Sequence, residues 1–583
     1  MSVALPEVVE KELAHYQNTI DLLHAGAIDA DKVFRPFRLV HGVYGQRQPG
    51  EVQMVRIKLK YGVITPDQLR VLASTAEKYA NGISHITTRQ AIQFHYVPLD
   101  KTPALLRELE ECGLTTREAC GNAVRAVCGS PLAGTRADEI FNVDPYAEQC
   151  FQHFLRGPLS ASLPRKFKIS FGTTDADPLQ QTNIQDVGIT PVLKDGKQGF
   201  RVVVAGALGS SPQAPITVRE FCEKADLLPV IEAAVRVHHK YGDRQNRAKA
   251  RLKFVLRTKG DEGFRALIEE QVAEALKAGT KGAALPDALP AANPTPIPIT
   301  GSAAEQEWRQ WNVKSHREAG YAVVSLCIRR GDLNPAEVRA TADLGEKYSE
   351  GDIRSTNDQN LIFRRVKIAD LSALYAGLVP LGYTRRAHTI VDVVSCPGAS
   401  TCQLGLTLSK NLGKELEEVL ASLPLDPGLQ SAHINISGCP NSCGQHHIGT
   451  IGFHGASSKV GDKIVPHYVM LVGGGDDGAT VTHASLIARI PARKIATVVK
   501  ALSGWYLEER KAGEDFKAWL RRTAGQGLEK AAASAARVAL KERIVPLCAI
   551  SEDGLKDEDL YDIGSTQLFS ASMAELGAGE CMA

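Results

Sequence analysis

The chain has no long hydrophobic run and almost no net charge. No stretch reaches the roughly eighteen apolar residues that a membrane-spanning helix needs, so no such helix is expected. A net charge of +2 argues against a protein that binds polyanions, although a local basic pocket for a small anion remains compatible with it. The N-terminal stretch MSVALPEVVEKELAHYQNTI lacks the basic and apolar regions of a secretory signal. We therefore expect a cytoplasmic protein.

Recognisable nucleotide-binding and electron-carrier modules are also missing. The sequence has no G-x-G-x-x-G after a predicted strand, no flavodoxin-like segment and no C-x2-C-x2-C run of ferredoxin type. Gly473–Gly475 follows a strand, but two aspartates come next, which makes a poor phosphate cradle, and we interpret it as a turn. If the protein carries out redox chemistry, its electrons must come from a separate protein.

The composition is that of a globular protein with several domains. A length of 583 residues predicts roughly three to five domains, and the 44% apolar content is ordinary. Twelve cysteines at this dilution do not suggest a disulfide framework, and they fit a reducing compartment. Eight of them show no pattern and are interpreted as free thiols: Cys112, Cys120, Cys128, Cys150, Cys222, Cys327, Cys548 and Cys581.

The other four cysteines form two spaced pairs. Cys396 and Cys402 are separated by five residues, and Cys439 and Cys443 by three. Pro or Gly beside the sulfurs predicts loops whose backbone N–H groups can point at a ligand, as around an iron–sulfur cluster. Structural zinc sites favour shorter knuckles on both halves, so the spacing favours a cluster over zinc. Zinc and a site without metal both remain alternatives at this point.

A helix followed by a strand occurs twice in the chain. Thr65 and Pro66 predict the start of a helix that runs to Tyr79, and a strand is expected over 83–97. Residues 66–97 align without a gap on residues 335–366, at a constant offset of 269. We interpret this as an internal duplication whose copies pack as one pseudo-symmetric domain. Because Arg89 becomes Asp358 in the second copy, we expect a single site away from the symmetry axis.

The remaining segments predict α/β structure. We expect strands over 37–40 and 52–59, helices near 218–240 and 261–277, a strand over Tyr468–Val472 and a helix over 483–503. The strand His433–Ile436 leads directly into the second cysteine loop, a position where α/β proteins place ligands.

The cysteine loops resemble the C-x5-C and C-x3-C signature of the siroheme-dependent sulfite and nitrite reductases, most closely the assimilatory sulfite reductases. The similarity extends from about residue 37 to about residue 540. It implies an α+β fold in which two ferredoxin-like half-domain repeats form one pseudo-symmetric domain, accompanied by two α/β domains that bind siroheme and a [4Fe–4S] cluster. The predicted segments are an N-terminal helical segment (1–36), the first half repeat (37–120), the first siroheme-binding domain (121–277), a Pro-rich linker (278–304), the second half repeat (305–380), the second siroheme and cluster domain (381–545) and a C-terminal tail (546–583).

The resemblance also implies the site residues. Cys396, Cys402, Cys439 and Cys443 would bind the [4Fe–4S] cluster, and Cys443 would also be the axial ligand of the siroheme iron. Two arginines and two lysines would bind the substrate, at Arg89, Arg125, Lys166 and Lys168. Alternation in Lys166-Phe167-Lys168 places both lysines on one face of the chain. Arg165 is expected to meet siroheme carboxylates, and Asn441 and Gln445 to contact the macrocycle or order the loop of Cys443.

The implied reaction is the six-electron reduction of sulfite to sulfide in sulfur assimilation and cysteine biosynthesis. Electrons would enter at the cluster and cross the Cys443 sulfur to the siroheme iron. Family sulfite reductases carry a motif like Arg-Lys-Phe-Lys, whereas nitrite reductases tend to have Asn at the position of Lys168, so sulfite is favoured. The alternatives are nitrite reduction to ammonia and a non-catalytic iron–sulfur protein. The electron donor is either an NADPH-dependent flavoprotein or a ferredoxin, and neither nucleic acid nor membrane is an expected partner.

Overall fold

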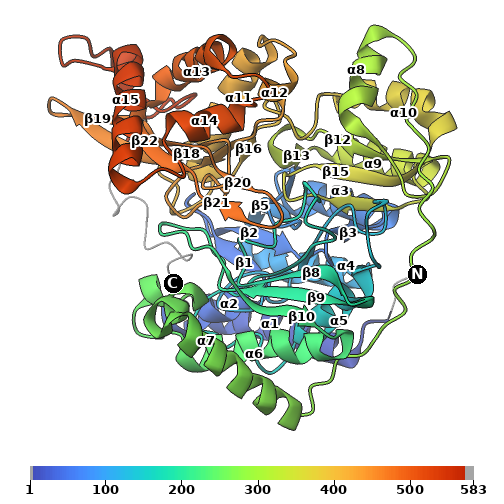
Figure 1. Ribbon diagram of the computed structural model, residues 1–583. Coiled ribbons are helices and arrows are strands. Elements are labelled where there is room, and N and C mark those ends of the chain that lie inside the picture. The colour runs from blue at the N-terminus through green and yellow to red at the C-terminus, as the bar shows by residue number, and fades with distance from the viewer. Residues whose placement is uncertain (1–3, 571–583) are drawn as a thin grey trace. The chain divides into compact units, whose positions relative to one another are not determined.

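The computed structural model describes residues 4–570 (Figure 1). Cys581 and the part of the predicted tail beyond residue 570 lie outside the described residues. Within the described part of the chain, no helix has the length and apolar character needed to cross a membrane. The scattered cysteines among the described residues are free thiols, as expected, and most of them are buried.

The described chain forms two compact units. The first contains the residues up to Ala207 together with Gln213–Thr384, and the second contains Leu208–Pro212 and the residues from Arg385 onward. Among the described residues, the first unit holds three five-stranded sheets, and the second holds one five-stranded sheet and a two-stranded ribbon. The finer division into seven segments stays a prediction.

The duplicated elements build two equivalent sheets that exchange an edge strand. The first has the order β1 (Val43–Gly45), β2 (Val52–Ile57), β5 (Ile92–Pro98), β4 (Ser84–Ile86) and β13 (Asp332–Leu333). The second has the order β11 (Val313–Ser315), β12 (Tyr321–Leu326), β15 (Leu361–Lys367), β14 (Ile353–Ser355) and β3 (Val63–Ile64). Each copy therefore completes the sheet of the other, through β13 and β3.

The helices of the two copies pack side by side and repeat their capping. Helix α3 (Pro66–Tyr79) and helix α9 (Pro335–Tyr348) both begin with a capping box, in which a side chain and the helix backbone bond reciprocally. Arg339 pairs with Glu77 at 2.8 Å, and the equivalent Arg70 pairs with Glu346. The predicted duplication is thus confirmed as a pseudo-twofold arrangement.

A pair of equivalent glutamines joins the copies. Gln90 and Gln359 both have a left-handed backbone, with φ of 54° and 65°, and both are almost completely buried. Gln90 donates from Nε2 to the Ser355 carbonyl at 2.9 Å, and Gln359 donates to the equivalent carbonyl of Ile86 at 3.1 Å. A left-handed backbone is unfavourable for glutamine and persists only where the surrounding structure requires it. We infer that these two hydrogen bonds hold the two copies together.

The third sheet of the first unit is mixed. Its order is β10 (Ile216–Cys222), β9 (Lys197–Val204), β8 (Val187–Lys194), β7 (Ile169–Phe171) and β6 (Cys128–Gly129). Strands β6, β7 and β8 are parallel, whereas β9 and β10 are antiparallel additions. Helices α5 (Asp144–Phe154), α6 (Leu227–Tyr241) and α7 (Leu252–Lys277) contribute to the same hydrophobic core.

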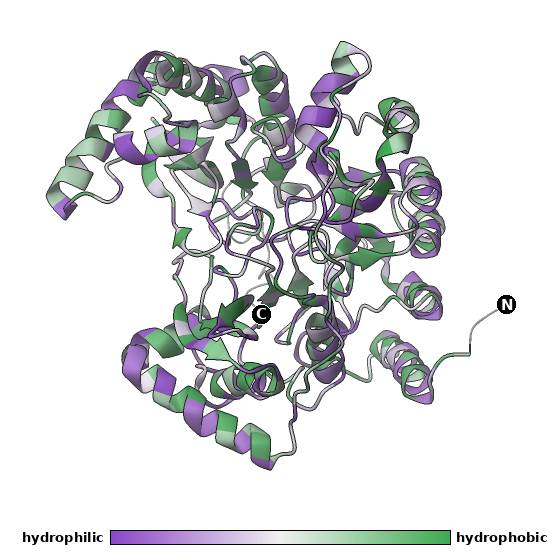
Figure 2. Ribbon diagram, turned by 45° about the vertical axis from the view of Figure 1, so that its right-hand side comes forward, coloured by the Kyte–Doolittle hydropathy of each residue, from purple (hydrophilic) through white to green (hydrophobic). Residues whose placement is uncertain are grey.

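The second unit repeats this plan with different elements. Its sheet has the order β16 (Val394–Ser395), β17 (Ile434–Ser437), β18 (Ile451–Val460), β19 (Lys463–Val472) and β22 (Ser485–Pro491), with the first three strands parallel. The ribbon pairs β20 (Gly475–Asp476) with β21 (Val481–Thr482). The helices are α11 (Ser409–Ala421), α12 (Pro427–Gln430), α13 (Ile495–Glu509), α14 (Phe516–Thr523) and α15 (Lys530–Cys548). Figure 2 shows hydrophobic residues concentrated on the strands, while the helices also carry hydrophilic residues.

The other helices of the first unit complete the half repeats. They are α1 (Glu7–His24), a π-helical turn over Ala30–Phe34, α2 (Arg35–Val40), α4 (Thr102–Glu111), α8 (Ala303–Asn312) and α10 (Leu371–Leu378). Residues 280–300 form no helix or strand. They are nevertheless hydrogen-bonded to the rest of the first unit, because Asn293 N–H donates to Arg317 O at 2.7 Å and Asn142 N–H donates to Asp287 O at 2.9 Å.

Four sequence predictions of secondary structure were wrong. The strand expected over 83–97 is two strands, β4 and β5, separated by a turn. Residues 37–40 belong to helix α2, which follows from a proline in its first turn. Residues 218–222 belong to strand β10, and the helix near 218–240 begins only at Leu227. The predicted helix over 483–503 is strand β22 followed by α13, and Pro491 at the strand end was the neglected signal.

We predict that Gln359→Ala lowers the free energy of unfolding by about 1–3 kcal/mol, because it leaves the buried Ile86 carbonyl without this donor. Urea unfolding followed by far-UV circular dichroism measures the change. The control is Arg339→Ala, which removes only an exposed ion pair and should have no measurable effect. Equal effects of the two variants would show that the glutamines do not hold the two copies together.

Candidate active site

The predicted cations lie at the amino ends of the parallel strands in the first unit. Arg125 N–H donates to the Phe167 carbonyl at 2.9 Å, and Phe167 N–H donates to Ala123 O at 2.9 Å. Val187 N–H donates to Lys168 O at 3.0 Å. Sheet pairing just before β6, β7 and β8 therefore brings Arg125 and Lys168 together, although about forty residues separate them in the chain.

Arg89 reaches the same place from the half repeat. It lies in the turn between β4 and β5, and its guanidinium donates to Gln185 Oε1 at 2.8 Å and to the Ala126 carbonyl at 2.7 Å. Burial lowers the pKa of Arg89, and the charge of Arg125 lowers it further. The two arginines are thus close enough to repel each other.

The two lysines share one face, as the alternation predicted. Phe167 is fully buried in the hydrophobic core, while Lys166 and Lys168 are only half-buried. Burial lowers the pKa of Lys168 far below its ordinary value, with Arg89, Arg251 and Lys166 adding to the effect. An ammonium group in this position releases its proton more readily than a free lysine does.

Arg125 is held mainly by backbone carbonyls. It donates to Ala119 O at 2.9 Å and to Gly121 O at 2.8 Å, and more distantly to the Tyr44 hydroxyl at 3.4 Å. Only 9% of its surface is exposed. Most of its N–H groups therefore bind the protein, which makes Arg125 a fixed positive charge.

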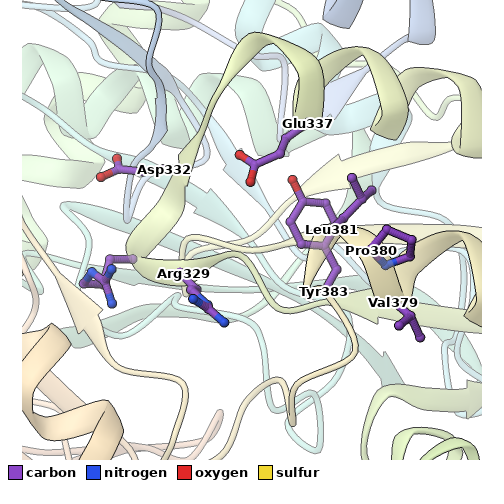
Figure 3. A pocket seen from close by; sticks show the side chains of 9 residues that line it. Arg329, Asp332, Glu337, Val379, Pro380, Leu381 and Tyr383 are labelled. Atoms are coloured by element: carbon purple, nitrogen blue, oxygen red, sulfur yellow. The ribbon is translucent and has the colours of Figure 1, made fainter.

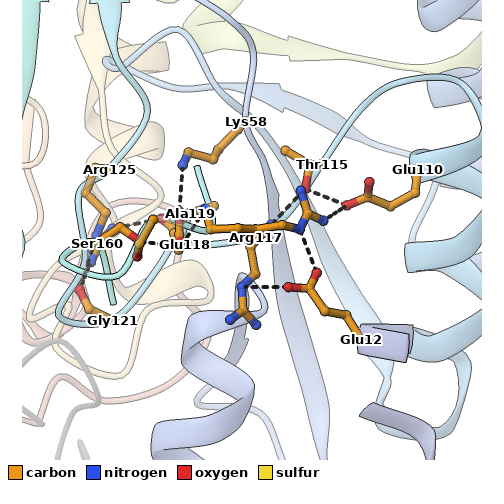
Figure 4. A network of polar contacts seen from close by, with 12 residues as sticks. Glu12, Lys58, Glu110, Thr115, Arg117, Glu118, Ala119, Gly121, Arg125 and Ser160 are labelled. Carbon is orange, nitrogen blue, oxygen red and sulfur yellow. Dashed lines mark hydrogen bonds and ion pairs between the residues drawn. The ribbon is translucent and has the colours of Figure 1, made fainter. Parts of the chain in front are cut away.

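A buried carboxylate anchors the loop that supplies those carbonyls (Figure 4). Glu118 is 1% exposed and has a left-handed backbone, with φ of 58°. It accepts from Ser160 Oγ at 2.5 Å and from Arg156 N–H at 3.1 Å, and Lys58 Nζ lies 3.7 Å away. Burial lowers the pKa of Lys58 to about 8, against the opposing charge of Glu118.

Three residues that the sequence did not single out belong to this cluster. Arg251 and Lys253 bring further positive charge from the start of α7, and Asp186, at the start of β8, pairs with Arg251 at 2.9 Å. Burial lowers the pKa of Lys253 to about 7, with Arg251 and Arg257 contributing. One apolar residue separates Arg251 from Lys253, as one separates Lys166 from Lys168. This spacing is the sequence signal that could have identified Arg251 and Lys253.

The cluster suits a strongly anionic ligand. Several cations face few carboxylates, and the pKa values of Lys168 and Lys253 fall because of burial first and then because of the neighbouring cations, which Asp186 offsets only in part. A macrocycle bearing many carboxylates, such as siroheme, fits this excess. Arg165 lies next to Lys166 and is half-buried, and its carbonyl accepts from His238 Nε2 at 2.9 Å.

The four cysteines lie together in the second unit, at the carboxyl ends of β16 and β17. Gly438 N–H donates to Cys396 Sγ at 3.2 Å, so one loop hydrogen-bonds a sulfur of the other. A Cβ on Gly438 would lie 2.6 Å from the Gly398 Cα, which explains why glycine is needed where the loops meet. The predicted strand-to-loop position of the second pair is confirmed.

The four cysteine side chains also affect one another electrostatically. Burial raises the pKa of the Cys439 thiol, followed by the charges of Cys443, Cys396 and Cys402, while the Asn441 backbone N–H lowers it. The thiols are nevertheless not close enough to ligate a single metal ion, because no group of three or more His, Cys, Asp or Glu among the described residues could hold one. Four neighbouring thiols with backbone amide donors fit an iron–sulfur cluster.

The loop of Cys443 is ordered by buried polar groups. Cys443 is the exposed member of the four, whereas Gln445 is buried with a left-handed φ of 62°. Ser437 Oγ accepts from Gly444 N–H at 3.0 Å, and Asn435 Nδ2 donates to Gly444 O at 3.0 Å. Ser437 and Asn435, which the sequence did not indicate, therefore position the loop, and Asn441 contributes its backbone while its side chain is exposed.

A separate cavity of about 430 Å³ lies in the second copy, between residues 329–332 and 379–383 (Figure 3). Glu337 lines it at the position equivalent to Gln68 in the first copy. Gln68 donates from Nε2 to Cys112 O at 3.2 Å, a bond that an ionised Glu cannot make. None of the predicted site residues lines the cavity.

The chain matches two described families. The nitrite and sulphite reductase 4Fe-4S domain matches residues 120–276 and 386–537. The nitrite/sulfite reductase ferredoxin-like half domain matches residues 44–112 and 314–381. The second match covers the two copies of the duplication, including Arg89, and the first covers Arg125, Lys166, Lys168 and all four cysteines.

Similar proteins carry both substrate names. The chain is 29% identical to the assimilatory ferredoxin-dependent nitrite reductase of Haloferax mediterranei, over 84% of this chain and 86% of that protein. It is 27% identical to sulfite reductase (ferredoxin) 1 of Mycolicibacterium paratuberculosis, over 80% of this chain and 82% of that protein. The solved structure of the Mycobacterium tuberculosis NirA protein superposes with a TM-score of 0.74 at 26% identity, covering 90% of this chain and 95% of that one.

We predict that Glu118→Ala destabilises the protein by about 3–5 kcal/mol, because it leaves the buried Lys58 charge without its partner. Replacing both partners, as Lys58→Met with Glu118→Gln, should cost far less than the single change. Urea unfolding of the single and double variants measures the difference. A double variant that loses as much stability as Glu118→Ala would mean that the unpaired Lys58 charge is not the cause.

Proposed function

Because the chain belongs to the nitrite and sulphite reductase family, whose members use siroheme and a [4Fe–4S] cluster, we propose that it is an assimilatory sulfite reductase. The protein is an oxidoreductase of the nitrite/sulfite reductase type. The proposed reaction is the six-electron reduction of sulfite to sulfide, with electrons from a separate donor protein. The observation that carries the choice of sulfite is Lys168, which stands where the resemblance expects Asn in nitrite reductases.

Each group of residues has a proposed role. Cys396, Cys402, Cys439 and Cys443 would hold the cluster, with Cys443 also a ligand of the siroheme iron, and Arg165, Asn441 and Gln445 would support the macrocycle. When bound, the siroheme supplies an iron that takes the substrate, and the cluster supplies electrons. The names of the ferredoxin-dependent relatives support a ferredoxin as the donor.

The cations of the first unit would bind and protonate the substrate. Arg89 is half-buried and bonded to the protein through one N–H on each terminal nitrogen, so its other N–H groups are available to oxyanion oxygens. Arg125 supplies a fixed positive charge. Lys166 and Lys168 are the better proton donors, because an arginine stays protonated and burial has already lowered the pKa of Lys168.

Nitrite reduction to ammonia is the second candidate. It is favoured by the names of several similar proteins, including the ferredoxin–nitrite reductase of Zea mays, which is 29% identical over 72% of this chain. The same cations suit nitrite, which is also a small oxyanion.

An assay with reduced methyl viologen as electron donor ranks the two substrates. We predict sulfide from sulfite and ammonia from nitrite, with the larger kcat/KM for sulfite. A larger kcat/KM for nitrite would assign the chain as a nitrite reductase. Formation of neither product by protein that contains siroheme and iron would refute the proposal.

We further predict that Lys166→Met lowers kcat for sulfite by about 100-fold or more while KM changes little, because general acid catalysis contributes roughly that much. Lys240→Met is the matched control, since Lys240 is an exposed lysine of α6 that pairs with Glu270 at 2.8 Å. Equal losses in kcat and in sulfite affinity would instead show that Lys166 only binds the substrate.

A further inference from the structure

Two adjacent residues at the start of β8 accept hydrogen bonds from three distant segments, from the guanidinium groups of Arg89 and Arg251 and from the backbone N–H of Lys168. Gln185 Oε1 accepts from Arg89 NH1 at 2.8 Å. The carboxylate of Asp186 accepts from Lys168 N–H at 2.9 Å and from Arg251 NH2 at 2.9 and 3.1 Å. A single dipeptide thus connects the turn after β4, the lysine segment before β7 and the start of α7.

The dipeptide is rigidly held. Gln185 and Asp186 are 1% and 0% exposed. The carbonyl of Asp186 accepts from Ala205 N–H at 2.9 Å, and Ala205 has a left-handed backbone with φ of 64°. A Cβ on the next residue, Gly206, would lie 2.8 Å from the Gln185 carbonyl, so only glycine allows this approach. The surrounding backbone therefore fixes where the two side chains point.

Asp186 is also the negative charge of the cluster. The groups that act on Lys168 are Arg89 from the half repeat, Arg251 from α7 and Lys166 from its own segment, all of which lower its pKa, and Asp186, which raises it. Asp186 likewise raises the pKa of Lys253 and of His238. No other carboxylate acts on Lys168 among the principal charged neighbours found in the described part of the chain.

We propose that Asp186, together with Gln185, is the positioning element of the substrate pocket, and that Asp186 brings Arg251 into the pocket as a fifth cation beside Arg89, Arg125, Lys166 and Lys168. This inference rests on the proposed function, because it assigns roles toward the oxyanion that the cations bind. Gln185 holds Arg89 through a hydrogen bond to an uncharged amide, whereas Asp186 binds the Lys168 backbone and favours the protonated form of its side chain against burial and the neighbouring cations. The two residues therefore affect the enzyme differently.

The test uses the holoenzyme with siroheme and cluster bound. Asp186→Asn keeps an oxygen for the Lys168 N–H but removes the charge. Without that charge the pKa of Lys168 falls, so Lys168 loses its proton at a lower pH. We expect the alkaline fall of kcat to move to lower pH by about one pH unit or more. The pH at which the affinity of the oxidised protein for sulfite begins to fall should move in the same direction.

Gln185→Ala is the neutral companion variant. It removes an acceptor of Arg89 without changing any charge, so it should weaken sulfite binding about tenfold, as loss of one good hydrogen bond does. The alkaline fall of kcat and the pH at which sulfite affinity begins to fall, here called the two pH positions, should not move. Asp177→Asn is the structural control, because Asp177 is a buried carboxylate that accepts from Thr173 Oγ1 at 2.6 Å. It should lower the melting temperature without moving either pH position.

Three results would contradict the account. If Asp186→Asn leaves both pH positions where the wild type has them, Asp186 is not the counter-charge and the inference fails while the proposed function stands. If Asp177→Asn moves them as far as Asp186→Asn, the effect is structural. If the wild-type holoenzyme neither binds nor reduces sulfite or nitrite, the proposed function itself fails, and the inference with it.

Discussion

Repulsion between like charges is the constraint on which the first unit depends. Sheet pairing, a turn of the half repeat and the start of α7 bring Lys168, Arg89 and Arg251 together, where burial removes the water that would screen their charges. Asp186 offsets only part of this charge, and the backbone must be fixed tightly enough to keep the cations from moving apart. An incoming oxyanion relieves the remaining repulsion, which is why this cluster suits binding and proton donation to a small anion.

The duplication explains how so asymmetric a site arises in a symmetric domain. Exchange of β3 and β13 makes the two copies structurally inseparable, and Gln90 and Gln359 repeat the same buried bond across the joint. Equivalent contacts in both copies thus stabilise the scaffold, while side chains at other equivalent positions differ between the copies. Arg89 builds the cation cluster in one copy, and Asp358 stands at the equivalent position in the other.

Features with a local signature were predictable from the sequence, and features made by distant contacts were not. The cysteine spacing and the strand before Cys439 identified the loops, and the offset of 269 residues identified the repeat. The exchanged strands have two residues each, too short to show alternation. Asp186 binds Arg251 across 65 positions, and a single acidic residue before a strand has no distinguishing pattern. Most of the missed residues act through contacts that only the folded chain creates.

The claim that the cation cluster exists to bind an oxyanion is tested most directly by the dissociation constant of sulfite for the oxidised holoenzyme, compared between wild type and Arg89→Ala. Because charge-assisted hydrogen bonds contribute about 1.5–3 kcal/mol, the account predicts at least tenfold weaker binding in the variant. Arg70→Ala, an exposed arginine on α3, should bind sulfite like the wild type. The same dissociation constant in all three proteins would contradict the account.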